Sequence, residues 1–499
     1  MFKTPKEVYH DFKKKEIDKL TAEDLLIYLL ENAKTDDIRI ECLKILQKIG
    51  SKNQKIFSIL ENLLISDSNE EIRILAANIL KILFRDKFLI PLRWALQHET
   101  SWQFLMDIIL TITEINDENA KSILIEKIKN FENYKFNSSL SNLFKNKHIN
   151  NFKVAQLAEI ASNYIIIKYF VDTLKQIKFQ VKNGLVTELD LSFTSNDISG
   201  WKILKDLSKF IGSLKKLKKL ILKSNRISPF PESILSLKSL KYLDLSHNEI
   251  KKLPENISSC ESLEYLNLRY NNLLEIPNSI GDLKNLKILD LKHNKLSTLP
   301  PLIQELSGLE VLNLHGNLFT TLPKSIEGLP SLKKLKLGLN NLNYVPKWIK
   351  SLCSLKMLGL GGNKALSDDF ENWIDFLPSL HELNLYDSNI RKLPKSIGKL
   401  DSLEKLIIPN NKLSSLPESF KQLKNLRKLD LSWNDITYLP EWINSLKLLE
   451  ELNLRGNKLE DLPETISELK QLKVLNITLN KNMIQIPKDL INKDLKIYR

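Results

Sequence analysis

The sequence predicts an α/β solenoid with a parallel sheet on its concave side, preceded by an all-α domain. One observation is a block of 23 residues that recurs from about residue 217 to residue 475, with a single longer step of 25 residues. A second is that residues 1–178 lack this block, and their apolar residues recur at helical spacing. A period of roughly 20–50 residues is typical of units that stack because none can bury its apolar face alone. The sequence therefore predicts two domains, 1–178 and 179–499.

Two segments of the all-α domain, 35–50 and 68–84, resemble each other. Both open with a polar cap and an acidic first turn, and both continue with Ile-Arg and an apolar stripe. A shorter helix is expected between them at 54–64, a weaker third copy at 102–115, and a fourth helix pair at 119–144. The pattern resembles HEAT-type repeats, which implies a HEAT-like domain. An irregular helical bundle is the alternative.

A short hairpin is expected where the two domains meet. Asn183-Gly184 separates two alternating segments, and this dipeptide is a strong signal for a two-residue hairpin turn. The hairpin, near 179–191, would cap the first repeat and cover leucines that otherwise face water. A helix is expected to end at Phe210, and the polar tail near 482–499 is expected to cap the far end of about thirteen repeats.

Each position of the repeat has a physical role. The two leucines of the pattern LxL point to one face of a short strand, because side chains alternate along a strand, and this face is the interior. An Asn follows where the chain leaves the strand, and its amide can satisfy turn groups that would otherwise be buried unpaired. A ladder of such residues, with one Ser, is expected at Asn225, Asn248, Asn271, Asn294, Asn317, Asn340, Asn363, Ser388, Asn411, Asn434, Asn457 and Asn480.

One repeat departs from the pattern. After Asn363 the chain has no LPxxI, and Phe370, Trp373 and Phe376 predict an α-helix on the convex side. The expected role of this helix is packing.

The pattern LxxLxLxxN from Leu217 onward is the signature of a leucine-rich repeat. The 23-residue spacing and the convex LPxxI, as in Leu299-Pro300 and Leu393-Pro394, resemble the Ras-group class of leucine-rich repeat proteins, which includes plant intracellular members and a scaffold of Ras–Raf–phosphatase signalling. The resemblance covers about 280 residues. It implies a horseshoe with a parallel concave sheet, acting as a non-enzymatic scaffold or adaptor in signal transduction, with a small GTPase or its regulator as partner.

The strand residues between and beside the leucines face the concave side. The position before each LxL holds aromatic or aliphatic residues in four successive repeats: Tyr242, Tyr265, Ile288 and Val311. Beside them lie two further groups: Arg269, Lys292 and His315, and then His247, Tyr270 and His293. An exposed apolar stripe with a polar rim and Tyr and Arg anchors is typical of a protein-binding surface. The alternative is that β-propensity alone placed these residues on strands.

A second candidate surface is rich in small residues. Four glycines leave bare backbone that a partner can approach closely, and three large side chains accompany them. The glycines are Gly338, Gly359, Gly361 and Gly362, and the large residues are Met357, Tyr386 and Trp433. The string LGLGGNK imitates a phosphate loop, but Asn363 is in register with the ladder and the spacing of a phosphate loop is absent.

The sequence predicts no catalytic, metal or cofactor site. Asp244 and Asp290 fall two repeats apart on an open groove, where nothing would raise the pKa of either carboxyl group. His247, His293 and His315 spread over four repeats without a closed set of metal ligands. We therefore expect a protein that is not an enzyme.

The net charge of +14 raises the alternative of nucleic-acid or anionic-surface binding. The three strand-face columns, however, carry nine basic and seven acidic residues. A nucleic-acid groove needs one continuous sign of charge with interleaved aromatic residues, so this pattern argues against nucleic acid as the partner.

Cysteine usage and hydropathy bear on location. The three cysteines lie far apart without a CxxC motif or a secreted framework, which indicates a reducing compartment. The first residues lack the apolar core of a signal peptide, and no apolar run approaches the length of a membrane span. We therefore expect a cytoplasmic monomer without a membrane span.

Overall fold

The computed structural model describes residues 3–131, 148–174, 177–194, 211–368, 374, 377, 379–480, 484–491 and 495–499. Internal contacts divide the chain into two units, Met1–Lys175 with Phe179–Thr187, and Gln176–Lys178 with Glu188–Arg499. The limits 1–178 and 179–499 for independently folding domains stay a prediction.

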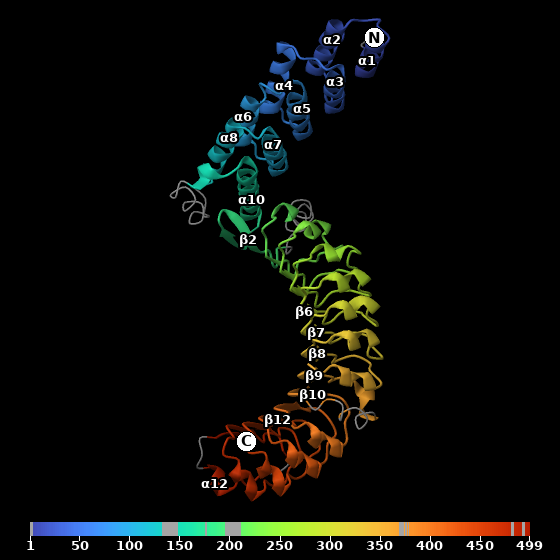
Figure 1. Cartoon of the computed structure of the whole chain (residues 1–499), viewed down its shortest axis with the longest axis vertical. Coiled ribbons are helices and arrows are strands. Elements are labelled where there is room, and N and C mark those ends of the chain that lie inside the picture. The colour runs from blue at the N-terminus through green and yellow to red at the C-terminus, as the bar shows by residue number, and fades with distance from the viewer. Residues whose placement is uncertain are drawn as a thin grey trace. The chain divides into compact units, whose positions relative to one another are not determined.

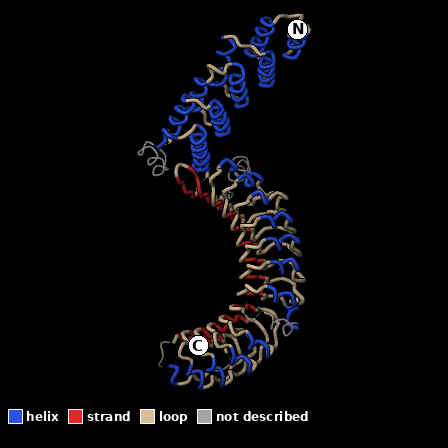
Figure 2. The backbone as a smooth tube through the Cα atoms, viewed as in Figure 1, coloured by secondary structure: helices blue, strands red, loops and turns tan. Residues whose placement is uncertain are grey.

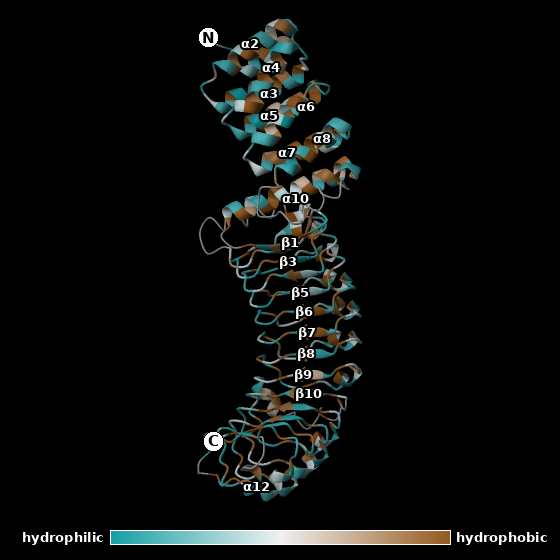
Figure 3. Ribbon diagram, turned by 90° about the vertical axis from the view of Figure 1, so that its left-hand side faces the viewer, coloured by the Kyte–Doolittle hydropathy of each residue, from teal (hydrophilic) through white to brown (hydrophobic). Residues whose placement is uncertain are grey.

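The first unit is built mainly from α-helices (Figure 1). They are α1 (Pro5–Lys13), α2 (Lys19–Glu31), α3 (Asp36–Ile49), α4 (Gln54–Ser66), α5 (Glu70–Leu83), α6 (Leu89–His98), α7 (Trp102–Ile115), α8 (Glu118–Lys129) and α10 (Val154–Thr173), with a 3-10 turn η1 (His148–Asn151). Polar caps fix several helix starts, because the side chains of Asp18, Asn53 and Ser101 each accept a hydrogen bond from a first-turn N–H. The helices carry both hydrophobic and hydrophilic residues (Figure 3), and the hydrophobic ones supply the buried core of this unit.

The two matching segments of the sequence are helices α3 and α5, and the weaker third copy is α7. Of the fourth expected pair, the structure describes α8, and residues 132–144 lie outside the described residues. The HEAT-like assignment of this all-helical region stays a prediction.

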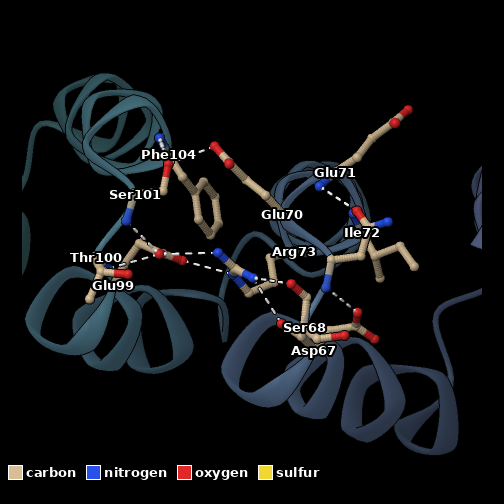
Figure 4. Close-up of polar contacts among 11 residues, drawn as sticks. Asp67, Ser68, Glu70, Glu71, Ile72, Arg73, Glu99, Thr100, Ser101 and Phe104 are labelled. Carbon is tan, nitrogen blue, oxygen red and sulfur yellow. Dashed lines mark hydrogen bonds and ion pairs between the residues drawn. The ribbon is translucent and has the colours of Figure 1, made fainter. Parts of the chain in front are cut away.

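The Arg of each Ile-Arg pair makes an equivalent ion pair in α3 and α5. Arg73 donates from Nε and Nη2 to the two carboxylate oxygens of Glu99 at 2.8 and 3.1 Å, and from Nη1 to the backbone oxygen of Asp67 at 2.8 Å (Figure 4). Glu99 follows the end of α6 and also accepts hydrogen bonds from the next two backbone N–H groups. Arg39 on α3 pairs with Asp67, which follows the end of α4. The repeated Ile-Arg therefore places an Arg where it binds the end of a later helix.

Strands β1 (Lys178–Lys182) and β2 (Leu185–Asp190) are hydrogen-bonded neighbours. Asn183 and Gly184 join them with φ angles of 52° and 77°, and two positive φ angles are what a two-residue hairpin turn of this kind requires. The hairpin is therefore present where the sequence predicted it. The end of β2 then pairs in parallel with β3 (Lys219–Ile221).

Among the residues that the structure describes, fifteen strands form one sheet in sequence order. Those after β3 are β4 (Tyr242–Asp244), β5 (Tyr265–Asn267), β6 (Ile288–Asp290), β7 (Val311–Asn313), β8 (Lys334–Lys336), β9 (Met357–Gly359), β10 (Glu382–Asn384), β11 (Lys405–Ile407), β12 (Lys428–Asp430), β13 (Glu451–Asn453), β14 (Val474–Asn476) and β15 (Lys496–Tyr498). The central residues of neighbouring strands are in register, as Leu243, Leu266 and Leu289 are, and these three are fully buried. In the second unit the strands lie on the concave edge and short helical turns on the convex edge (Figure 2).

The convex edge is made of short 3-10 turns. They are η2 (Ile211–Ser213), η3 (Glu232–Ser236), η4 (Ile257–Ser259), η5 (Asn278–Asp282), η6 (Pro301–Glu305), η7 (Lys324–Gly328), η8 (Lys347–Ser351), η9 (Lys364–Asp368), η12 (Lys395–Lys399), η13 (Glu418–Gln422), η14 (Glu441–Ser445) and η15 (Glu464–Glu468). The Pro of LPxxI precedes most of these turns with the φ that its ring imposes, −65° at Pro300. The Ile that follows, Ile303 in that repeat, is fully buried and closes the interior from the convex side.

The expected Asn ladder is present between consecutive repeats. Asn294 donates from Nδ2 to the backbone oxygens of Leu268 and Leu291, both at 3.0 Å, and its Oδ1 accepts from the backbone N–H of Leu273 at 3.0 Å. Asn317 makes the same three bonds one repeat later. The ladder confirms the role that the sequence predicted for this Asn.

The C-terminal end of the repeats carries one strand more than the sequence predicts. The tail at 482–499 contains α12 (Lys488–Ile491) and β15, which pairs in parallel with β14, so the sheet continues by one strand beyond the thirteen predicted repeats. The helices expected to end at Phe210 and to contain Phe370, Trp373 and Phe376 fall on positions outside the described residues.

Candidate functional site

Sheet register assembles the first predicted surface. Tyr242 lies opposite Tyr265, Tyr265 opposite Ile288, and Ile288 opposite Val311 on successive parallel strands. All four side chains are half-buried. The two tyrosine rings stack with their centroids 4.2 Å apart and their planes 3° apart. We call these four residues the tyrosine stripe.

Both tyrosines of the stripe are held in their neutral form. Burial raises the pKa of Tyr242, and a hydrogen bond to Tyr265 raises it further. Burial also raises the pKa of Tyr265, against the opposing effect of the bond from Tyr242. The stripe therefore presents two uncharged hydroxyl groups beside aliphatic side chains, a combination of apolar area and hydrogen-bonding capacity that suits a protein interface.

A row of four rings runs along one edge of the tyrosine stripe. His247 stacks on Tyr270 at 4.4 Å between centroids, and Tyr270 lies 4.5 Å from His293. His293 in turn lies edge to face with His315 at 5.3 Å. We call His247, Tyr270, His293 and His315 the ring row.

Three rings of this row stand on left-handed backbone. The φ angles of His247, Tyr270 and His293 are 55°, 54° and 50°, at the position immediately before the ladder Asn. Side chains with a Cβ are disfavoured in this region, and glycine is not. Other repeats place a glycine at the same position, as Gly316 and Gly456 show, or another large side chain, as Leu339 and Trp433 show. This row differs in that three successive repeats carry rings there and the rings contact one another.

The histidines of the ring row are uncharged near neutral pH. Burial lowers the pKa of His247 and His293, and the positive charge of nearby Arg269 or Lys292 lowers it further. Burial, together with Lys292, lowers the pKa of His315 to about 4. The edge of the surface is consequently aromatic rather than cationic.

Positive charge on this surface comes from Arg269 and Lys292. Arg269 is half-buried, and its Nε is buried without a hydrogen-bond partner among the described residues. Lys292 Nζ lies 6.0 Å from the ring centre of Tyr270. By contrast, the carboxylate of Asp244 is buried and accepts hydrogen bonds from the Asn267 side chain and from a backbone N–H. The guanidinium therefore keeps an unpaired Nε, whereas the acid is satisfied within the sheet.

The second predicted surface divides in the structure. Met357 and Tyr386 line a hollow on the concave face that His315 and Lys292 also line, so this part is continuous with the ring row. Trp433 lies apart from that hollow, where Arg455 covers its ring at 5.8 Å. The sequence signal for the connection is that His315 and Tyr386 share one column, the residue after LxL, with glycines in the two repeats between them.

The described residues outside this surface offer few groups for metal binding or nucleophilic chemistry. Among the residues that the structure describes, no group of three His, Cys, Asp or Glu side chains is arranged to hold a metal ion. Burial raises the pKa of Cys42 to about 12 and that of Cys260 to about 11, so neither thiol ionises at neutral pH. Within the same described parts, no helix has the length and apolar character needed to cross a membrane.

Models of known protein families match the repeated region. The leucine-rich repeat region model matches residues 255–360 and 348–493, and a second leucine-rich repeat model matches residues 215–273. A search of curated proteins gives no match.

Several solved structures are similar. A leucine-rich repeat protein of Leptospira interrogans is 34% identical, with 62% of this chain and 94% of that chain covered and a TM-score of 0.46. An internalin of Listeria monocytogenes is 22% identical, with 64% and 91% covered and a TM-score of 0.51. The Arabidopsis receptor kinase HAESA, solved with a peptide hormone and a co-receptor, is 30% identical, with 61% and 48% covered and a TM-score of 0.45. This chain spans about half the length of that receptor chain (48%).

Leucine-rich repeat proteins generally bind other proteins and are typically not enzymes. The family models across residues 215–493, together with the parallel ladder of strands closed by convex turns, show that this chain belongs to the leucine-rich repeat family.

Proposed function

We propose that this chain is a non-enzymatic scaffold or adaptor that binds a protein partner on the concave face of its repeats. The tyrosine stripe supplies the centre of the contact, and the ring row with Arg269 and Lys292 supplies its edge. Aromatic residues and arginine are the side chains that most often carry binding energy at protein interfaces.

One observation carries this proposal: three successive repeats place contacting rings on left-handed backbone, at His247, Tyr270 and His293. A bulky residue there costs about 1–2 kcal/mol relative to glycine, and such strain tends to gather at functional sites. Glycine, serine and leucine serve the same position in other repeats, at Gly316, Ser224 and Leu339, so folding by itself does not call for three successive rings. Binding of a partner supplies a reason to keep them.

The finer parts of the proposal concern class, pathway and location. The 23-residue spacing and the convex LPxxI support a place in the Ras-group class, with a small GTPase or its regulator as the partner in signal transduction. We place the protein in the cytoplasm as a monomer. The exposed Cys353 and the lack of any disulfide among the described residues support a reducing compartment.

The helical region is proposed to be a separate HEAT-like domain, 1–178, joined to the repeats of 179–499. The equivalent ion pairs of Arg39 and Arg73 support a repeated unit. Residues 1–178 expressed alone should give a helical circular dichroism spectrum. A spectrum dominated by strand or disordered chain would contradict this part of the proposal.

Affinity capture with the full chain tests the binding surface. Proteins retained by the wild type and identified by mass spectrometry should be lost with Tyr265→Ala, while the melting temperature stays nearly unchanged. Tyr438→Ala is the matched control, because Tyr438 is 59% exposed and lies outside the strands of the concave sheet.

Three outcomes contradict the proposal. Equal loss of capture and of melting temperature with Tyr265→Ala would assign that residue a structural role. Equal retention by both variants would remove the stripe from the interface. Retention of nucleic acid alone, with affinity that falls steeply as salt rises, would favour the anionic alternative.

A further inference from the structure

The concave face has a hollow of about 200 Å³ beside strands β8, β9 and β10. Three glycines, Gly338, Gly359 and Gly361, lie among its lining residues, together with the rings of His315 and Tyr386. These two rings come from repeats on either side of the glycines, yet their centroids are only 6.5 Å apart with 31° between their planes. The rings therefore flank a recess whose base is largely bare backbone.

Two of the glycines are required by the rings. A Cβ at Gly361 would lie 2.2 Å from Cδ1 of Tyr386, and a Cβ at Gly338 would lie 2.8 Å from Nδ1 of His315. Each ring thus lies directly over a glycine. The packing of the chain explains these two residues without any ligand.

Gly359 has no such explanation. A Cβ there would meet nothing nearer than the Cα of Lys336 at 3.8 Å, and its φ lies outside the left-handed region. The same strand position carries a side chain in the neighbouring repeats, at Asn313, Lys336 and Asn384. Because glycine weakens a strand, its presence here costs stability and only keeps the hollow open.

The lining combines a thioether and two aromatic rings with lysine side chains that have no ion pair in the described parts of the chain. Met357 offers a thioether, which contacts aromatic rings favourably, next to the rings of His315 and Tyr386. Lys292 and Lys336 also line the hollow, and neither has an ion pair among the described residues.

Three other lysines of the concave strands are paired, whereas Lys334 on β8 has no ion pair among the described residues. Lys219, Lys405 and Lys428 each pair with a glutamate on a neighbouring strand. The cations at the hollow are therefore left for an anion from outside the chain, and the charge of an occupant should be negative next to its ring.

The size of the hollow selects the kind of occupant. Sites for cofactors and drug-sized ligands occupy about 300–1,000 Å³, which is more than this hollow provides. A space of about 200 Å³ matches one aromatic side chain. Burial keeps His315 uncharged at neutral pH, with its pKa lowered to about 4, so its ring does not repel the lysines or hold a carboxylate itself.

We propose that this hollow is an anchor pocket for one aromatic side chain of the protein partner, taken from a segment in which acidic residues flank that aromatic residue. The aromatic ring enters the hollow beside His315 and Tyr386, where Gly359 leaves room, and the flanking carboxylates pair with Lys292 and Lys336. This inference rests on the proposed function and names the chemistry of the segment that the concave face recognises.

Ligand-observed saturation-transfer NMR with the full chain tests the pocket. The capped peptide EEYEE should receive saturation on its ring protons, EEAEE should receive none, and KKYKK should bind more weakly by about tenfold or more, as expected for loss of an anchor contact. ATP is the small-molecule arm, and saturation of its adenine protons in place of the peptide ring would overturn the proposal.

Gly359→Asn is the variant that fills the pocket without disturbing the fold, because Asn occupies that strand position in neighbouring repeats. It should abolish transfer to EEYEE while melting at the wild-type temperature or above. Gly308→Asn is the matched control, because a Cβ there also meets only ordinary contacts, the nearest at 3.4 Å, and Asn285 and Asn425 fill that position elsewhere. It should bind EEYEE like the wild type.

Capture of the protein partner separates this inference from the function on which it rests. If EEYEE does not bind, or if it binds Gly359→Asn as it binds the wild type, the anchor pocket is refuted. In that case the proposed function is still supported if Tyr265→Ala fails to capture the protein partner that the wild type captures. Loss of the partner with both Gly359→Asn and Tyr265→Ala, but not with Gly308→Asn, supports both proposals.

Discussion

Replacement of Asn294 by Leu tests the ladder on which the repeats depend. The Leu side chain has the same branching and the same number of heavy atoms but neither donates nor accepts a hydrogen bond. Of the three groups that Asn294 binds, the backbone oxygen of Leu268 keeps a bond from Asn271, and that of Leu291 keeps one from Asn317. The N–H of Leu273 loses its only acceptor among the described residues.

The expected cost follows from that count. One buried donor left unpaired costs about 1–3 kcal/mol, and each half-satisfied carbonyl adds a smaller amount, of the order of 0.5 kcal/mol. Asn294→Leu should therefore lower the free energy of unfolding by about 2–4 kcal/mol, well above the effect of an ordinary surface change.

Urea unfolding of the full chain, followed by circular dichroism, measures this difference. Asn285→Leu is the control, because Asn285 makes one exposed hydrogen bond, 2.8 Å to the backbone oxygen of Glu261. The control should stay within about 0.5 kcal/mol of the wild type. Equal unfolding midpoints for the two variants would show that the buried amide does not hold the turns together.

Three further predictions concern ion pairs, strain and pH. Arg73→Met leaves the buried Glu99 without its cation and should lower the free energy of unfolding in urea by about 3 kcal/mol. Arg93→Met breaks a largely exposed ion pair with Glu126 and should cost under about 1 kcal/mol. Similar costs for the two variants would contradict the reasoning. Tyr270→Gly relieves left-handed strain of about 1 kcal/mol and loses ring contacts of similar energy, so the free energy of unfolding should change by less than about 1 kcal/mol while partner capture falls. Retained capture would remove the ring row from the interface. The pKa of His315 is about 4 in the folded chain against 6.5 ordinarily, so the unfolded chain binds the proton more tightly, and the stability from this group should be present above pH 6.5 and be lost as pH falls towards 4. His315→Phe should flatten the plot of urea midpoint against pH between these two values. An unchanged slope would contradict this reasoning.

The concave surface joins two features that sequence reasoning kept apart. The tyrosine stripe with its ring row and the glycine-rich patch were separate candidates, and His315 belongs to both because its ring leans over Gly338 into the hollow. Trp433, which the sequence grouped with Met357 and Tyr386, lies elsewhere. A side chain's column follows from the repeat, but the direction in which it leans depends on whether a neighbour leaves room.

Periodicity is enough to predict the backbone plan of the repeats. The period of 23 residues, the paired leucines and the Asn allow one arrangement that buries every apolar face and pairs every turn amide, so the register of the tyrosine stripe follows from counting along the chain. Helices α3 and α5 follow in the same way from apolar spacing, a local property of the chain; the expected side-chain cap is present at Asn69 of α5, whereas Thr35 of α3 makes no cap hydrogen bond. The extra strand β15 does not follow, since it lacks a complete repeat and forms by pairing with the edge of β14.

The sequence alone determined that leucines turn inward and that aromatic residues line the concave side, because the alternation of side chains along a strand and the length of each repeat are fixed by covalent geometry. The tertiary structure alone decided that Arg73 meets Glu99, that His315 and Tyr386 approach one another across two repeats, and that Gly359 leaves open the hollow that both rings line. These contacts depend on which rotamers the neighbouring side chains leave free, and no pattern read along one chain records that.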